Sequence, residues 1–321
     1  MPMYKKIILL LCTIVFISCN EDAKIEKEIA EVPVDFEVVR FDREFAEANP
    51  EKLMDLKQEY PFLFPQQFSD RVWIQKLNDT IQQEINVEVG KAFPSFENKE
   101  AELHSLFQHI KYYFPQFEVP KVFTVTSEVD YKNKVILQDE YLFISLDTYL
   151  GEEHHFYIGI QEYLKKNFKE EQIIPDVANA YAEKYVPRPN SRTFLAHMLY
   201  YGKLLVLKDK FTPEITDAEK IGYTEEERIW AQKNEAQIWR YFVENELLFD
   251  TDTELYSRFL YPAPFSKFYL ELDAESPARL GQYIGWQIVR SYMEKTNASL
   301  EEMIATDAET IFNKANFKPR K

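Results

Sequence analysis

The scarcity of glycine constrains the fold of this chain more than any other feature: only 7 of its 321 residues are glycine. Helix-forming residues abound in its place, so we expect a mostly helical structure. Apolar residues at helical spacing predict helices at about 43–58, 66–90, 97–114, 155–168, 175–185, 191–208, 224–248, 253–259, 277–295, 299–305 and 307–315.

The pattern changes between residues 121 and 146. Segment 121–127 is rich in β-branched residues, and segments 135–138 and 141–146 follow it with only Asp139 and Glu140 between them. These three segments predict a small sheet. The alternating lead-in at 32–45 is a candidate for a further strand at 34–41. The predicted fold class is therefore α+β, mostly helical, with a sheet of about three to four strands.

The N-terminus predicts a lipoprotein. Lys5 and Lys6 precede an apolar run of about eleven residues, which is too short to span a bilayer but fits the core of a signal peptide. The run ends at Ser18-Cys19, and a small residue directly before a cysteine is where lipoprotein signal peptidase cuts. Phe16 departs from the usual pattern, in which leucine is commoner. The alternative is an ordinary secretory signal with a chance cysteine.

This interpretation divides the chain into a signal peptide at 1–18, a lipidated flexible tether at 19–31 and a single globular domain at 32–321. The tether is charged and poor in aromatic residues, so we expect it not to fold. Cys12 leaves with the signal and Cys19 carries lipid. The folded part therefore has neither a disulfide nor a cysteine metal site.

The formal net charge of −16, about −18 once Lys5 and Lys6 are removed, disfavours binding to nucleic acid and to anionic lipid headgroups. The expected partners are proteins, peptides or cations. The alternative is that the acidic surface only keeps the protein soluble.

His197 is the most informative of the five histidines. Its setting in a predicted helix after a small sheet is typical of a zinc metallopeptidase, whose H-E-x-x-H motif places two zinc ligands and a general base on one helix. Here Met198 stands at the position of the base and Tyr201 at that of the second ligand. The motif is degenerate, so we expect no metal, no other cofactor and no catalysis. The alternative is an interior histidine, hydrogen-bonded beside Tyr201.

The other histidines give weaker signals. His104 and His109 lie on a polar helix and are expected at the surface. His154 and His155 follow a predicted strand, where an exposed loop is the better interpretation than a metal site.

The segment 277–295 carries two glycines four residues apart, Gly281 and Gly285, so another backbone can approach closely there. Ser276 and Pro277 predict the start of its helix. Arg279 would then lie in the first turn, where the helix dipole disfavours a cation, so we expect a carboxylate partner. Trp286 is a candidate aromatic anchor at the tight contact.

Three stretches together resemble the gliding-motility lipoprotein family GldB of Bacteroidetes: the lipobox at Cys19, residues 192–207, and above all residues 276–293. Ala278 and Tyr283 depart from the family pattern, where glycine and tryptophan are usual. The family is distantly similar to predicted zinc-dependent proteases, which implies a degenerate zincin-like scaffold with vestigial positions at His197, Met198 and Tyr201. The segment 276–293, with Pro277, Arg279, Gly281, Gly285 and Trp286, would serve in structure or in partner contact.

The resemblance implies a non-catalytic role in assembling or stabilising the gliding apparatus, which is linked to type IX secretion. The partners would be other proteins of that apparatus, and the lipid would anchor the chain to the outer membrane. The acidic residues after Cys19 resemble a surface-export signal, but the membrane face stays open.

Two rival functions remain. One is an envelope zinc metallohydrolase, with ligands from His197, His154, His155 or carboxylates of 224–248. The other is a ligand-binding lipoprotein with an exposed aromatic platform.

Overall fold

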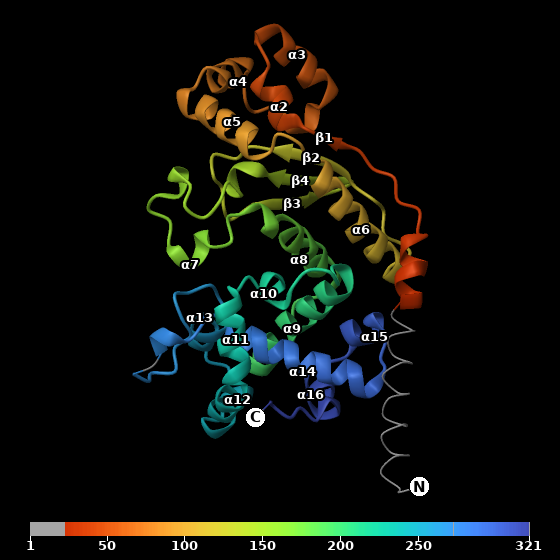
Figure 1. Cartoon of the computed structure of the whole chain (residues 1–321), viewed down its shortest axis with the longest axis vertical. Coiled ribbons are helices and arrows are strands. Elements are labelled where there is room, and N and C mark those ends of the chain that lie inside the picture. Colours follow the sequence, from red (N-terminus) through yellow and green to blue (C-terminus); the bar gives the residue numbers. More distant parts are fainter. Residues whose placement is uncertain (1–22, 272, 321) are drawn as a thin grey trace, which may run out of the picture.

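The computed structural model describes residues 23–271 and 273–320, so the predicted signal peptide and Cys19 lie outside the described residues. The fold is α+β and mostly helical, with one small sheet, as the sequence predicts (Figure 1). Among the described residues, no helix combines the length and the apolar character needed to cross a membrane.

The sheet has four strands in the order β1-β2-β4-β3. They are β1 (Val38–Val39), β2 (Lys121–Val125), β3 (Val135–Gln138) and β4 (Tyr141–Ser145). The first three in this spatial order are parallel, and β3 pairs antiparallel with β4 at the edge. Asp139, in the two-residue connection between β3 and β4, has a φ of 52°, as a tight hairpin requires. The candidate fourth strand is present, although it is only two residues long.

Alternate residues of the central strands face two different apolar layers. Phe123 and Phe143 face a small cluster formed with α2 (Phe41–Ala46), α3 (Pro50–Glu59) and α4 (Asp70–Leu77). Leu142 and its neighbours of the same parity face a large cluster that includes α6 (Glu97–Tyr113) and α8 (Ile173–Tyr185). Figure 1 shows the sheet between these two sets of helices.

The helix α9 (Phe194–Phe211) is central to the second half of the chain. Apolar residues are buried on all its sides, which is typical of a helix enclosed by others. Around it lie α10 (Asp217–Ile221), α11 (Glu225–Lys233), α12 (Glu235–Glu244), α13 (Glu254–Phe259), α14 (Leu280–Thr296), α15 (Leu300–Ala305) and α16 (Ala308–Ala315). The large apolar cluster runs from Ile85 to Ala315 and so spans both halves. The division into domains stays a prediction.

Four predicted helices are wrong in their continuity. The segment 43–58 is two helices, α2 and α3, because Asn49 accepts hydrogen bonds from the backbone amides of Glu51 and Lys52 and starts a new helix. The segment 66–90 is two helices, because Asp79 accepts hydrogen bonds from the first backbone amides of α5 (Thr80–Ala92) and starts a new helix. The segment 224–248 breaks at Asn234, whose amide donates to the Trp230 carbonyl at 2.9 Å. The segment 155–168 holds only a 3₁₀ turn at His155–Tyr157 and the short α7 (Glu162–Lys165), with Gly159 between them at a φ of +89°.

The expectation that segment 19–31 does not fold is wrong for its described residues. Residues 23–30 are helical and lie against α6, with Ile29 only 1% exposed. The Tyr112 hydroxyl donates to Glu28 at 2.9 Å, and the Gln108 amide donates to the carbonyls of Ala30 and Val32. The charged residues therefore find polar partners on α6, while one apolar side chain enters the core.

His109 lies under this N-terminal helix and is buried, contrary to the expected surface position. Its Nδ1 lies 2.7 Å from the Ser105 carbonyl, and its Nε2 lies 3.3 Å from a Glu26 carboxylate oxygen. The polar pattern of α6 did not show that a second helix covers it. His104 is half-buried, near Phe36.

Candidate functional site

The degenerate metallopeptidase positions lie in the first turns of α9. This helix begins at Phe194, after Thr193 accepts a hydrogen bond from the Ala196 amide. The His197 imidazole is half-buried and packs on the ring of Tyr256, with ring centroids 4.4 Å apart. Burial and the nearby Arg188 lower the pKa of His197. Met198 is fully buried in the core, whereas Tyr201 lines a cleft.

The other proposed metal ligands lie elsewhere. His154 and His155 approach Glu88 and Glu84 of α5, at 3.5 and 3.0 Å. Across residues 23–271 and 273–320, no three His, Cys, Asp or Glu side chains are placed to hold one metal ion. The structure therefore does not bring the ligands of the rival metallohydrolase together, and the residues around His197 do not fit zinc.

The close backbone approach expected from the two glycines of α14 is present. A side chain on Gly285 would overlap the backbone of Met198 in α9, and one on Gly202 would overlap the carbonyl of Gly285. A Cβ on Gly281 would lie 2.9 Å from the Phe259 carbonyl oxygen. The turn of α9 that carries the vestigial positions is therefore a packing surface for α14.

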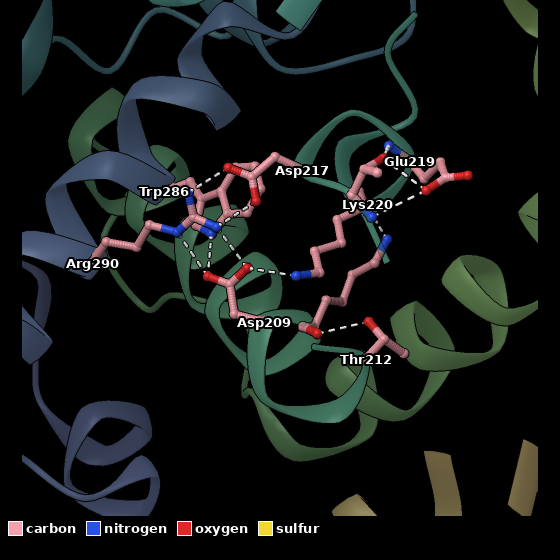
Figure 2. Close-up of polar contacts among 9 residues, drawn as sticks. Asp209, Thr212, Asp217, Glu219, Lys220, Trp286 and Arg290 are labelled. Carbon is pink, nitrogen blue, oxygen red and sulfur yellow. Dashed lines mark hydrogen bonds and ion pairs between the residues drawn. The ribbon is translucent and has the colours of Figure 1, made fainter. Parts of the chain in front are cut away.

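A polar network lies next to this crossing (Figure 2). Arg290 of α14 donates two hydrogen bonds of 2.7 Å to Asp209 of α9 and two of 2.8 Å to Asp217 of α10. The buried Trp286 donates from Nε1 to Asp209 at 2.9 Å, and the Arg290 guanidinium lies 3.7 Å from its ring centroid. Lys220 approaches Asp209 at 3.3 Å. Bidentate pairs of this kind fix orientation as well as distance, so the network holds α9, α10 and α14 together.

The charges of this network stabilise one another. Burial alone would lower the pKa of Arg290, but its hydrogen bonds to Asp217 and Asp209 raise it above the ordinary value. Burial raises the pKa of Asp217, and the hydrogen bonds and charge of Arg290 more than reverse this effect. Arg290 and Asp217 are therefore both charged at neutral pH, and the network acts as a structural clamp.

Arg279 differs from the expectation in two ways. It precedes α14, which begins at Leu280, and has a φ of 59° in the left-handed region. Ser276 does not cap the helix, because its hydroxyl donates to the carbonyls of Ser266 and Asp273. The expected carboxylate partner is also wrong. The Arg279 guanidinium donates to the Gly222 carbonyl at 2.7 Å and lies 5.5 Å from the Tyr223 ring centroid, and no described ion pair includes it.

Arg279 and Tyr201 line one cleft of about 320 Å³. Its wall also carries Lys134, paired with Asp176, and Lys166, whose Nζ lies 2.7 Å from Glu227. Burial lowers the pKa of Lys166 despite its carboxylate partner, and burial likewise lowers the pKa of Arg279. The cleft therefore gathers three cationic side chains, together with the carboxylates of Asp176 and Glu183.

Gly222 organises the floor of this cleft. Its φ of +69° lies in the region that favours glycine, and its carbonyl accepts hydrogen bonds from both Arg279 and Asn167. A Cβ at this position would lie 2.8 Å from the Asn167 amide nitrogen. The residue thus fixes the direction of the Arg279 side chain.

Sequence reasoning missed both the clamp and the cleft. Arg290 lies in the segment that carries the family resemblance, but nothing in its spacing pointed to Asp209 and Asp217. The cleft joins residues from the β2–β3 connection, α8, α9 and the start of α14. The only local signal was the glycine after α10, which is typical of a helix end.

A family model described as "Gliding motility protein GldB" matches residues 22–319. No curated protein matches the chain. No solved structure matches it either, so the zincin-like scaffold stays a prediction.

Proposed function

The chain belongs to the family of gliding motility protein GldB, and from this premise we propose that it is a lipid-anchored component of the gliding apparatus, linked to type IX secretion, that assembles or stabilises the apparatus without catalysis. The observation that carries the proposal is the length of the match, which runs over nearly the whole chain. Other proteins of the apparatus would be its partners.

The non-catalytic role rests on the residues at the degenerate motif. Met198 stands where the general base would be, and a thioether cannot take a proton from water. Its side chain is fully buried and its backbone packs against Gly285, so the position serves the helix crossing. His197 faces Tyr256, and Tyr201 faces the cleft.

Metal analysis tests this part of the proposal. The protein, purified without a histidine tag, should hold far less than one zinc per chain, and His197→Ala should leave both metal content and motility unchanged. Stoichiometric zinc that is lost in His197→Ala would favour the metallohydrolase instead.

The proposed anchor is Cys19, on the periplasmic or the surface face of the outer membrane. Residues 23–30 fold against α6, so only residues 20–22 separate the lipid from the folded body. Four residue steps reach at most about 14 Å when fully extended. The N-terminal helix and the adjoining part of α6 would therefore lie close to the membrane, and the remaining surface would be free for partners.

Gene deletion tests the proposal as a whole. Cells without the gene should lose spreading and adhesin movement, and the wild-type gene should restore both. The Cys19→Ala variant should fold, remain unanchored and fail to restore movement. Normal movement in the deletion strain would refute the proposal, whereas full rescue by Cys19→Ala would refute only the anchor.

A further inference from the structure

We propose that the cleft beside the start of α14 binds the C-terminal carboxylate of a peptide, with Arg279 as its principal hydrogen-bond donor. The proposal rests on the cleft alone and depends neither on the lipid anchor nor on a role in motility.

Among the described ion pairs, none includes Arg279, although the charges of Glu227 and Asp176 act on it from farther away. It is partly buried, and its contacts are the Gly222 carbonyl and the Tyr223 ring. Withdrawing a charge from water is costly unless an opposite charge accompanies it. Lys134 and Lys166 line the same cleft, but each has its own carboxylate, in Asp176 and Glu227. Glu183 also lines the cleft, but it pairs with Arg188 at 3.8 Å and accepts a hydrogen bond from Asn179. Among the described charges of the cleft, only that of Arg279 therefore has no ion-pair partner within 4 Å.

The guanidinium is also held ready for a ligand. One terminal nitrogen donates to Gly222, while guanidinium carries five N–H donors in a planar fork that matches a carboxylate. Asn167 donates to the same carbonyl at 3.1 Å, so the anchoring oxygen is itself fixed. The left-handed backbone at Arg279 adds a strained conformation, which proteins often retain at binding sites.

The charge balance favours a monoanion. A carboxylate would neutralise Arg279, whereas a doubly charged phosphate would place a second negative charge beside Asp176 and Glu227. The overall charge of −16 adds to this penalty. A cation is disfavoured by the three cationic side chains that line the cleft.

The remaining lining fits the end of a peptide. Tyr201 and Tyr261 present phenol groups that can pair with the peptide backbone and pack on its side chains. Asn179 and Gln282 add side-chain amides, whose nitrogens also donate to Glu183 and to the Leu260 carbonyl. Burial raises the pKa of Tyr201, so its hydroxyl stays a neutral donor at neutral pH. The volume of about 320 Å³ lies at the lower end of ligand pockets, and it suits the last residues of a chain. Capture of a C-terminal carboxylate is an established mode of peptide recognition.

The test uses the full-length lipoprotein in detergent and an array of N-terminally immobilised hexapeptides. Each sequence is present as the free acid and as the C-terminal amide. We expect a set of sequences that bind as acids and at least about tenfold more weakly as amides, a difference of about 1.4 kcal/mol. Arg279→Lys keeps the charge but loses the fork, so it should weaken binding of the acids at least about tenfold. The matched control is Arg228→Lys, which changes an arginine paired with Glu225 on α11 and should have no effect.

A second pair of variants keeps the test decisive if Arg279→Lys folds poorly. Tyr261 is 48% exposed and lines the cleft. Tyr261→Glu should weaken binding of the acids by repulsion, while Tyr261→Gln, which is similar in size and neutral, should weaken it much less. Circular dichroism melting of each variant reports on the fold.

Several outcomes would overturn the proposal. Equal binding of acids and amides would exclude recognition of the carboxylate, and so would equal effects of Tyr261→Glu and Tyr261→Gln. The absence of any bound peptide would do the same. Competition by inorganic phosphate at lower concentration than acetate would identify a phosphate site instead.

Discussion

Gly202 of α9 and Gly285 of α14 meet backbone to backbone where the two helices cross. A side chain on Gly202 would overlap the carbonyl of Gly285 and come within 2.9 Å of the Trp286 nitrogen. Each glycine in a helix costs about 1 kcal/mol relative to alanine, so the close packing of the two backbones must offset this loss. The crossing is the packing reason for both glycines.

Gly202→Ala should therefore lower the free energy of unfolding by about 2–3 kcal/mol, because the methyl group forces two backbones apart. The control is Gly90→Ala in α5, where a Cβ would meet no atom within 4 Å. That variant should be about 0.5–1 kcal/mol more stable than the wild type. Urea denaturation measures both, and equal stability of the two variants would contradict the tight crossing.

The predictable part of this crossing was the glycine spacing. Gly281 and Gly285 lie on one helix face by their period of four, and no partner needed to be known. The residue that packs against Gly285 could not be predicted, because Gly202 lies about 80 residues earlier and no sequence pattern links the two glycines. The same limit explains Arg279, whose hydrogen-bond partner is the carbonyl of Gly222, 57 residues earlier.

Helix ends show a second limit of prediction, because a capping residue can find another hydrogen-bond partner. Ser299 and Glu302 form the capping box that their spacing predicts, since both partners lie within one turn. Thr306 and Glu309 have the same spacing, but Asp307 caps α16 instead. The hydroxyl of Ser276, likewise, already donates to the carbonyls of Ser266 and Asp273. A motif of two residues predicts a cap only when nothing else in the fold competes for it.

Asp209 accepts hydrogen bonds from both Arg290 and Trp286. Its removal should therefore lower the free energy of unfolding more than the loss of a surface ion pair. Asp209→Ala leaves the Trp286 Nε1 without its partner and halves the contacts of Arg290. We expect the free energy of unfolding to fall by about 2 kcal/mol. This is less than the 3–5 kcal/mol typical of fully buried pairs, because the Arg290 side chain is 29% exposed.

The control for this prediction is Glu225→Ala, which removes the partner of Arg228 on α11, where the glutamate is 55% exposed. It should change stability by less than about 0.5 kcal/mol. Thermal and urea unfolding of both variants separate the two cases. A similar decrease in the free energy of unfolding for both variants would show that the clamp around Asp209 stabilises the fold no more than a surface ion pair does.

The docked N-terminal helix predicts resistance to proteolysis. Ile29 is its buried residue, so Ile29→Ala should detach and unfold the helix. The backbone at Lys24 and Lys27, whose side chains are already exposed, would then become accessible to trypsin. Cleavage there should be at least about tenfold faster than in the wild type, because truncation of a buried isoleucine costs about 2–5 kcal/mol. Mass spectrometry of timed digests identifies the cut sites. The control is Ile81→Ala, at a position that is 61% exposed. Trypsin should cut this variant at Lys24 and Lys27 at the wild-type rate. Rapid cleavage of the wild type at these lysines would support the flexible tether predicted from the sequence.

Lys208 should give the stability of the protein a distinct dependence on pH. Burial lowers its pKa from 10.5 to about 7. Between these values the unfolded chain holds a proton that the folded protein has released, so unfolding takes up a proton. The free energy of unfolding should then rise with pH from about 7 towards 10.5, by at most about 1.4 kcal/mol per pH unit, and this contribution should be flat below pH 7.

Lys208→Met removes this contribution and keeps the length of the side chain. The difference in stability between wild type and variant should therefore shift in favour of the wild type as the pH rises from 6 to 9, measured by urea denaturation at each pH. Lys203, whose pKa burial lowers to about 8, is present in both proteins and cancels. The exposed Lys210, on the same helix, supplies the control Lys210→Met, whose difference from the wild type should not vary with pH in this way. Parallel curves for wild type and Lys208→Met would show that Lys208 keeps its proton in the folded protein, and that its hydrogen bond to the Lys220 carbonyl is made by an ammonium group.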